Sequence, residues 1–312
     1  MSSVGDRESI TPPAVLGFSY SHGVNWSNYQ AYRPIYPRSF FQRIYDYHSA
    51  KQGAGWSIAH EVGAGCGIVS AALAERFDRV VVSDPNDGYT TLARDLLVEK
   101  ARLPEAKFAF LQERGEESSL QSGTVDMIAA CECIQWMNLS QAVEEFAREL
   151  VQGGTAAITY YSRPIIEGNE RANKAWVAII AAVVANGQTE VYANVYKVGH
   201  SALDCVGFPS EKWGGVKRIY INSQLGYDVF KLDHNVGDSQ VKVGEEQIWE
   251  EEEDEDWIQM RGLQWFQGFV ATWVPRIMMS QIQELWDEFE LALGGEEVKT
   301  KIPLVMVFAT KL

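Results

Sequence analysis

Three glycines at alternate positions separate an apolar stretch from a run of helix-forming residues in the first quarter of the chain. They are Gly63, Gly65 and Gly67, and an acid, Glu61, precedes the first of them by two residues. Glycine allows sharp turns and lets backbone amides come close to a ligand, and a glycine loop between a strand and a helix is typical of nucleotide sites. A dinucleotide-binding loop requires a further glycine where this chain has Ile68. The carboxylate instead suits a ligand that carries a positive charge near the loop.

Acids also follow the next apolar stretches. Asp84 ends the second stretch, where a carboxylate can accept hydrogen bonds from both hydroxyls of a ribose, although an acid there can equally cap the following helix. Residues 113–119, ERGEESS, follow the third stretch and would close around an adenine together with the CECIQW segment at 131–136. A ribose, an adenine and an amino-acid tail with a cationic centre together describe S-adenosylmethionine.

The elements that must position these residues alternate between strand and helix patterns. Short apolar strands are expected at 56–62, 78–84, 107–112, 125–132 and 155–161, with helix-forming stretches between them. Such alternation indicates an α/β fold with right-handed crossovers and a parallel sheet that carries helices on both faces.

Beyond residue 161 the alternation stops. We expect a long helix at 169–187, a strand at 216–224, a partly helical aromatic stretch at 256–275, an amphipathic helix at 280–293 and a closing strand at 301–312. The predicted division is an N-terminal segment and helix over the site (1–50), a core (51–161 and 276–312) and an inserted, substrate-selecting cap (162–275).

Four blocks of the chain resemble the class I S-adenosylmethionine-dependent methyltransferases, and within them the trans-aconitate methyltransferase-like group common in fungi, whose members methylate small molecules. The blocks are YQAYRPIYP (29–37), EVGAGCG (61–67), VVVSDPN (80–86) and VDMIAACECIQWMN (125–138). The first is the most specific to that group, whereas the glycine block is shared by the whole class. The resemblance implies a Rossmann-like fold with a mostly parallel seven-stranded sheet, helices on both faces and an inserted cap.

The resemblance also implies which residues hold S-adenosylmethionine. The glycine loop and its acid would face the methionine part, and the acid after the second strand would hold the ribose. An acid at 116 or 117 would lie beside the adenine, and the end of the fourth strand would line the sulfonium side. The N-terminal segment would cover the cofactor, with Arg33 in bidentate contact with its carboxylate. The implied set is Tyr29, Arg33, Glu61, Gly63, Gly65, Asp84, Glu116, Glu117 and Cys131.

One departure from the family concerns the end of the fourth strand. Relatives often have histidine before Trp136, where this chain has Gln135, and glutamine cannot act as a general base. Either the acceptor arrives already ionised, as a carboxylate would, or another residue takes the proton. The candidates for that role are Glu132, His22, His200 and His234. Glu132, Gln135 and Trp136 are the catalytic candidates, as residues that position the acceptor or line its pocket.

The composition limits partners and location. The chain has 312 residues and a net charge of −15, and nine of its acids lie in the segment 245–256. Without a basic stripe it is a poor candidate for binding nucleic acid or anionic membranes. It has no apolar run long enough to span a membrane and no secretory signal pattern, and its four cysteines do not suggest a disulfide framework. We expect a cytoplasmic protein, with the acidic segment a solvated loop or helix start, or else a surface for a cationic partner or a rim of the active site.

These observations favour a methyltransferase that acts on a small molecule, most readily at the oxygen of a carboxylate or phenol, with nitrogen next. Five scattered histidines and one C-x-C pattern predict no metal site. A protein on this fold that transfers no methyl group, as a cofactor-assisted cyclase or a partner subunit, stays an alternative. A nicotinamide oxidoreductase is less favoured, because the pairs Tyr47/Lys51 and Tyr227/Lys231 lie in the wrong context for its Tyr-x-x-x-Lys motif. The acceptor and the oligomeric state stay open.

Overall fold

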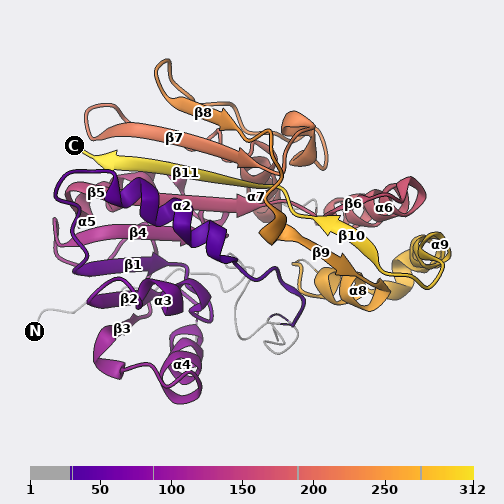
Figure 1. The fold of residues 1–312 in the computed structure, drawn as a ribbon, viewed down its shortest axis with the longest axis horizontal. Helices are drawn as coiled ribbons and strands as arrows, with labels where there is room; N and C mark the ends of the chain where they lie inside the picture. The colour runs from indigo at the N-terminus through magenta and orange to yellow at the C-terminus, as the bar shows by residue number, and fades with distance from the viewer. Residues whose placement is uncertain (1–28, 30, 87, 188–189, 275) are drawn as a thin grey trace, which may run out of the picture.

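A twisted sheet of eight strands forms the centre of the computed structural model, which describes residues 29, 31–86, 88–187, 190–274 and 276–312 (Figure 1). The strand order is β3-β2-β1-β4-β5-β11-β7-β8. The strands are β1 (Ile58–Val62), β2 (Arg79–Ser83), β3 (Phe108–Leu111), β4 (Val125–Cys131), β5 (Leu150–Tyr161), β7 (Trp213–Ile221), β8 (Glu246–Trp249) and β11 (Leu304–Lys311). Only β11 pairs antiparallel with its neighbours, so the predicted Rossmann-like, mostly parallel sheet is confirmed.

Helices cover both faces of this sheet, as predicted. Successive residues of β4 show the two faces, because Met127 packs in one core cluster with Phe40 and Ile128 packs in the other with Phe146. Every residue of β4 is buried, as expected for a strand covered on both sides. The helices flanking the main sheet are α2 (Arg38–Ser49), α3 (Ile68–Leu73), α4 (Tyr89–Arg94), α5 (Leu139–Glu149) and α7 (Glu190–His200).

The expected number of seven strands is wrong by one, because the acidic segment contributes β8 at the edge of the sheet. β8 runs parallel to β7, and the Trp249 ring stacks on Tyr220 with centroids 3.9 Å apart. A strand of four residues with two of them exposed and polar has too weak an apolar alternation to stand out in an acidic segment.

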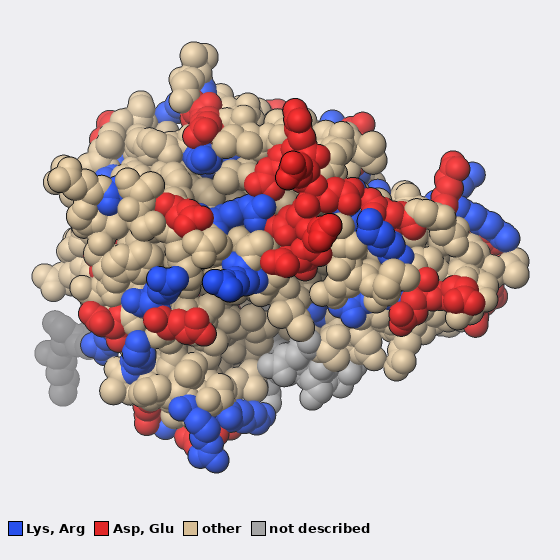
Figure 2. All heavy atoms as spheres, viewed as in Figure 1, with Lys and Arg blue, Asp and Glu red and all other residues tan. Residues whose placement is uncertain are grey.

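Three acids in the rest of the acidic segment, Glu250, Glu253 and Asp254, form ion pairs. Arg43 of α2 pairs with Glu250 at 2.8 Å and with Asp254 at 2.6 Å, and Lys301 pairs with Glu253. Figure 2 shows acidic side chains gathered near the centre of this face with basic side chains beside them. The segment therefore joins α2 to the region around Lys301, while Glu251, Glu252 and Glu255 are exposed to solvent.

A second, smaller lobe lies at one end of the main sheet (Figure 1). It contains a three-stranded antiparallel sheet, in the order β6 (Ile165–Glu167), β10 (Val298–Lys301) and β9 (Ile258–Arg261). Its helices are α6 (Glu170–Asn186), α8 (Leu263–Ala271) and α9 (Gln283–Leu293). Since β7 and β8 return to the main sheet from within residues 162–275, the chain enters this lobe twice rather than as one continuous insertion.

An aromatic cluster holds the small lobe together. Trp176 of α6 is fully buried against the rings of Phe266, Phe269 and Phe289, at centroid distances of 4.9, 6.2 and 6.0 Å. Its indole N–H donates to the carbonyl of Pro164 at 2.8 Å. Among the described residues, none of the helices is both long and apolar enough to cross a membrane.

Replacing Trp176 by alanine should lower the free energy of unfolding by about 3–5 kcal/mol, because the cavity left among the aromatic rings cannot close fully. Denaturant unfolding followed by circular dichroism measures this loss. The neighbouring Val177→Ala on the same helix, where the side chain is 37% exposed, should change stability by no more than about 0.5 kcal/mol. Equal losses for the two variants would contradict this packing.

Candidate functional site

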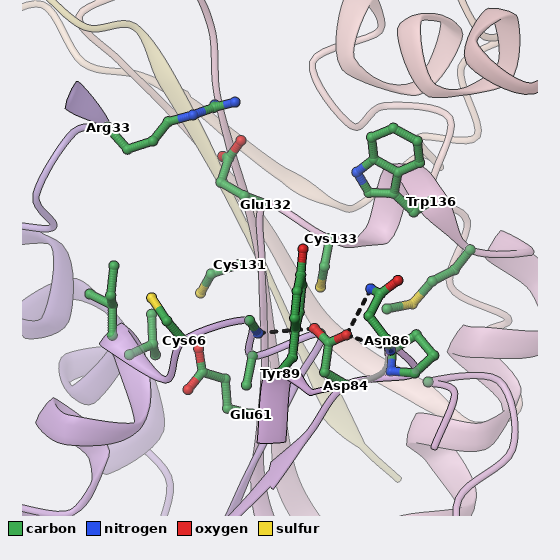
Figure 3. A pocket seen from close by; sticks show the side chains of 18 of the residues that line it. Arg33, Glu61, Cys66, Asp84, Asn86, Tyr89, Cys131, Glu132, Cys133 and Trp136 are labelled. Atoms are coloured by element: carbon green, nitrogen blue, oxygen red, sulfur yellow. Dashed lines mark hydrogen bonds between the residues drawn. The ribbon is translucent and has the colours of Figure 1, made fainter. Parts of the chain in front are cut away.

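A deep pocket opens where β1, β2 and β4 end (Figure 3), and Tyr29, Arg33 and Tyr36 of the segment before α2 also line it. Its volume, counted with its open mouth, is about 1040 Å³. Because the carboxyl ends of parallel strands meet at one edge of a sheet, residues distant in sequence face this space together. The residues predicted from the sequence that line it are Tyr29, Arg33, Glu61, Gly63, Gly65, Asp84, Glu116, Cys131, Glu132 and Trp136.

The glycine loop between β1 and α3 has a backbone that other residues rarely adopt. Gly63, Gly65 and Gly67 have φ angles of 63°, 54° and 79°, all in the left-handed region. A β-carbon added at Gly63 would lie 2.5 Å from the β-carbon of Cys133. Glycine is therefore required at this position both by the backbone and by the close approach of Cys133 in the turn after β4.

Asp84 fixes the loop to the end of β2. Its carboxylate accepts a hydrogen bond from the Gly65 amide at 3.0 Å, and from the backbone and side-chain amides of Asn86 at 2.8 Å each (Figure 3). Burial raises the pKa of Asp84 despite these bonds. The carbonyl oxygen of the Asn86 side chain is buried and has no partner among the described residues, so it can accept a hydrogen bond from a ligand.

Glu61 lies at the base of the pocket, at the end of β1. Its carboxylate accepts hydrogen bonds from the Ser70 amide, at 2.6 Å, and from the Ser70 hydroxyl. Burial raises its pKa to about 8, although the bonds from Ser70 act in the opposite direction. A positive charge bound nearby would favour its ionised form.

Arg33 joins the N-terminal segment to two other parts of the chain. It donates to the Thr272 hydroxyl at 2.8 Å, to the Thr272 carbonyl at 3.2 Å and to the Tyr161 hydroxyl at 3.1 Å. The guanidinium also lies over the rings of Tyr29 and Phe269. Each of its three nitrogens already donates within the protein, so only the remaining hydrogens of the two terminal nitrogens are left for the predicted contact with a carboxylate.

The three catalytic candidates occupy different places. Glu132 lines the pocket, with a φ of 58° and a carboxylate that accepts from the Tyr161 amide at 2.5 Å. Trp136 also lines it and meets Tyr192 of α7 edge to face, at 5.9 Å. Gln135 is buried outside the lining and donates to the backbone carbonyl of Glu132 at 2.9 Å. Gln135 can therefore act on the site only through Glu132.

Other candidates lie away from the pocket. Glu117 is exposed and does not line it, so Glu116 is the acid of that loop that faces the space. The Nδ1 atom of His200 lies 3.0 Å from the Asn235 carbonyl and 3.1 Å from Asp233, away from the lining, and His234 is exposed. His22 lies outside the described residues. The rival pairs Tyr47/Lys51 and Tyr227/Lys231 do not line the pocket either.

Several lining residues were not singled out from the sequence. Those that follow a strand, such as Asn86 after β2 and Cys133 after β4, could have been found by the strand-end rule that pointed to Asp84. Tyr36 and Tyr89, by contrast, do not follow a strand directly. The lining residues that were not singled out include Tyr36, Cys66, Asn86, Tyr89, Arg114, Cys133, Met137 and Tyr161. Among the described residues, no group of His, Cys, Asp or Glu is arranged to hold a metal ion.

The sequence is similar to those of known methyltransferases. A family model described as a methyltransferase domain matches residues 60–158. The sequence is 26% identical to methyltransferase cfoB of Aspergillus candidus, over 92% of this chain and 94% of the relative. It is 29% identical to methyltransferase ptaI of Pestalotiopsis fici, over 92% of each chain.

A solved structure shares the fold. The structure of a candidate type II methyltransferase from Anaeromyxobacter dehalogenans aligns with a TM-score of 0.60 at 17% identity, covering 89% of this chain and 97% of that chain. The names of these similar proteins give no methyl acceptor, so the finer resemblance to the trans-aconitate group stays a prediction.

A comparison of two alanine substitutions separates the backbone requirement from the close approach of Cys133. Gly53→Ala, at φ 78° with open space around it, should cost about 1 kcal/mol from left-handed strain alone. Gly63→Ala should cost about 1–3 kcal/mol more, because the new methyl group meets Cys133. Denaturant unfolding of both variants measures the difference, and equal losses would contradict the close packing at Gly63.

Proposed function

We propose that this chain, which is an S-adenosylmethionine-dependent methyltransferase, transfers the methyl group to an oxygen of a small molecule, a carboxylate or a phenol. The methyltransferase domain at 60–158 and the relatives that match along most of the chain confirm the family predicted from the sequence. The acceptor class rests on the pocket and is argued from its residues.

The observation that carries the cofactor assignment is the joining of the glycine loop to Asp84. The carboxylate lies between two strand ends and offers acceptors for a pair of ribose hydroxyls. The unpartnered carbonyl oxygen of Asn86 suits a further donor on the ligand. Glu61 supplies a negative charge on the side where a cationic amino-acid tail is predicted, and Glu116 would lie beside the adenine.

Aromatic side chains line the pocket around the predicted sulfonium, together with carboxylates and the cation Arg33. Tyr29, Tyr36 and Tyr161 contribute ring faces, which attract a cation. Burial raises the pKa of the Cys131 thiol, so this thiol stays protonated and packs as an apolar group. S-adenosylmethionine would supply the activated methyl group, while the protein orients the acceptor and excludes water.

We place the acceptor between Glu132 and Trp136. These side chains stand apart in Figure 3, with Glu132 near Arg33, and both line the pocket. Gln135 is proposed to position Glu132 through its backbone, and Trp136 to form the wall that meets α7 through Tyr192. Four free cysteines suit a reducing compartment, and we propose the cytoplasm.

Calorimetric titration with S-adenosylhomocysteine tests the cofactor assignment. The wild type should bind it, and Asp84→Ala should weaken binding at least about fivefold, because a charged hydrogen bond to the ribose is lost. Asp78→Ala, which removes an exposed acid just before the opposite end of the same strand, should leave the affinity unchanged.

Thermal unfolding of each variant controls for damage to the loop that Asp84 holds. Absence of binding by a folded wild type would remove the methyltransferase proposal for this pocket. Binding without any methylated product from a panel of acceptors would favour the alternative of a non-methylating protein on this fold.

A further inference from the structure

The backbone of Glu132 is held in a conformation that costs free energy. The backbone of a residue other than glycine is strained by about 1–2 kcal/mol at a φ of 58°, and such strain is concentrated at functional sites. Three hydrogen bonds keep it in place. The Glu132 amide donates to Thr159 at 3.1 Å, its carbonyl accepts from Gln135 at 2.9 Å, and its carboxylate accepts from the Tyr161 amide at 2.5 Å. The arrangement aims the carboxylate into the pocket.

One oxygen of this carboxylate is available to a ligand. The Tyr161 amide bonds to Oε1, and Oε2 has no hydrogen-bond partner among the described residues. The guanidinium of Arg33 lies near it in Figure 3 and is the cation whose charge acts on it. The other titratable groups that face Glu132 are neutral phenols and thiols whose pKa its negative charge raises: Tyr29, Tyr36, Cys131, Cys133, Tyr160 and Tyr161.

We propose that Glu132 is the catalytic base of this methyltransferase and that the acceptor is therefore a hydroxyl compound, such as a phenol, rather than a carboxylate. This inference rests on the function proposed above. The acceptor O–H bond breaks and its proton moves to Oε2 of Glu132. The freed electron pair of the oxygen forms the bond to the methyl carbon, and the pair of the breaking carbon–sulfur bond stays on sulfur. The proton then leaves Glu132 for solvent.

The charges lining the pocket disfavour a carboxylate acceptor. The lining contains the acids Glu61, Asp84, Glu116 and Glu132. Its cations within the described chain already face its own acids, since the charge of Arg33 acts on Glu132 and Arg114 lies 3.4 Å from Glu116. Where Glu132 is ionised, as it must be to accept a proton, an ionised acceptor beside it would meet a like charge, and the nearby cation, Arg33, already acts on Glu132. A neutral hydroxyl group avoids this repulsion and donates a hydrogen bond to Oε2.

Protonation of Glu132 sets the expected pH dependence. Burial raises its pKa to about 8, although the Tyr161 amide and Arg33 lower it. Below this pH the group is protonated and cannot accept the acceptor's proton, so methyl transfer should rise with pH through about 8 and then level off. Glu61 titrates in the same range, and for this reason the assignment needs a variant that removes only the response of Glu132.

The test uses Glu132→Gln, Glu132→Asp and the exposed control Glu290→Gln on α9, with a matched pair of ligands, 2-naphthol and 2-naphthoate. Glu132→Gln keeps an oxygen for the Tyr161 amide but cannot take a proton. It should lower kcat for phenols about a hundredfold or more and abolish the rise near pH 8. Glu132→Asp should recover part of the rate, and Glu290→Gln should match the wild type.

A binding measurement gives a readout that does not depend on turnover. With S-adenosylhomocysteine bound, at pH 9, wild type should bind 2-naphthol at least about tenfold more tightly than 2-naphthoate, because of the repulsion from Glu132. Glu132→Gln should close that gap. Its affinity for S-adenosylhomocysteine and its melting temperature should stay close to those of the wild type.

The outcomes separate this inference from the proposed function. Failure of the wild type to bind S-adenosylhomocysteine would remove both. If the cofactor binds normally, three results would overturn the role of Glu132 and leave the cofactor site intact. They are an unchanged rate and pH profile in Glu132→Gln, tighter wild-type binding of 2-naphthoate than of 2-naphthol, and no binding of either naphthalene compound.

Discussion

The hydrogen bond from the Gly65 amide to the Asp84 carboxylate joins the ends of two adjacent strands at the mouth of the pocket. The loop has left-handed backbone angles that glycine adopts most easily. The other oxygen of the Asp84 carboxylate accepts hydrogen bonds from Asn86. These bonds fix the separation of the loop and the acid before any ligand binds. A preorganised site of this kind loses little conformational freedom on binding.

A second set of contacts, made by Arg33, joins distant segments at the pocket and helps to keep its side chains buried from water. Arg33 reaches from the N-terminal segment to Thr272 at the end of α8 and to Tyr161 at the end of β5. Parts of the chain that are distant in sequence therefore form one wall. The same burial raises the pKa of Glu61 and Glu132 to about 8. Carboxyl groups that would be permanently ionised in solution can thus change protonation near neutral pH.

Local patterns were enough to predict the part of the fold that surrounds the pocket. The glycine spacing at 63–67 and the acid at Asp84 are determined by backbone geometry that is local to a strand end, and the strand–helix alternation up to residue 161 follows from apolar periodicity. β8 was missed because its four residues lie in an acidic segment and owe their strand to pairing with β7. Tyr161 was missed because its role depends on Arg33, 128 residues earlier. Long-range pairings of this type leave no periodic signal in the sequence.

A crystal structure of the protein with S-adenosylhomocysteine tests the central claim most directly, namely that the glycine loop and Asp84 form the cofactor site. We predict that the ribose hydroxyls bond to Asp84, that the amino-acid tail lies along the loop near Glu61, and that the sulfur faces the space between Glu132 and Trp136. A ligand bound elsewhere, or a ribose without contact to Asp84, would contradict the account.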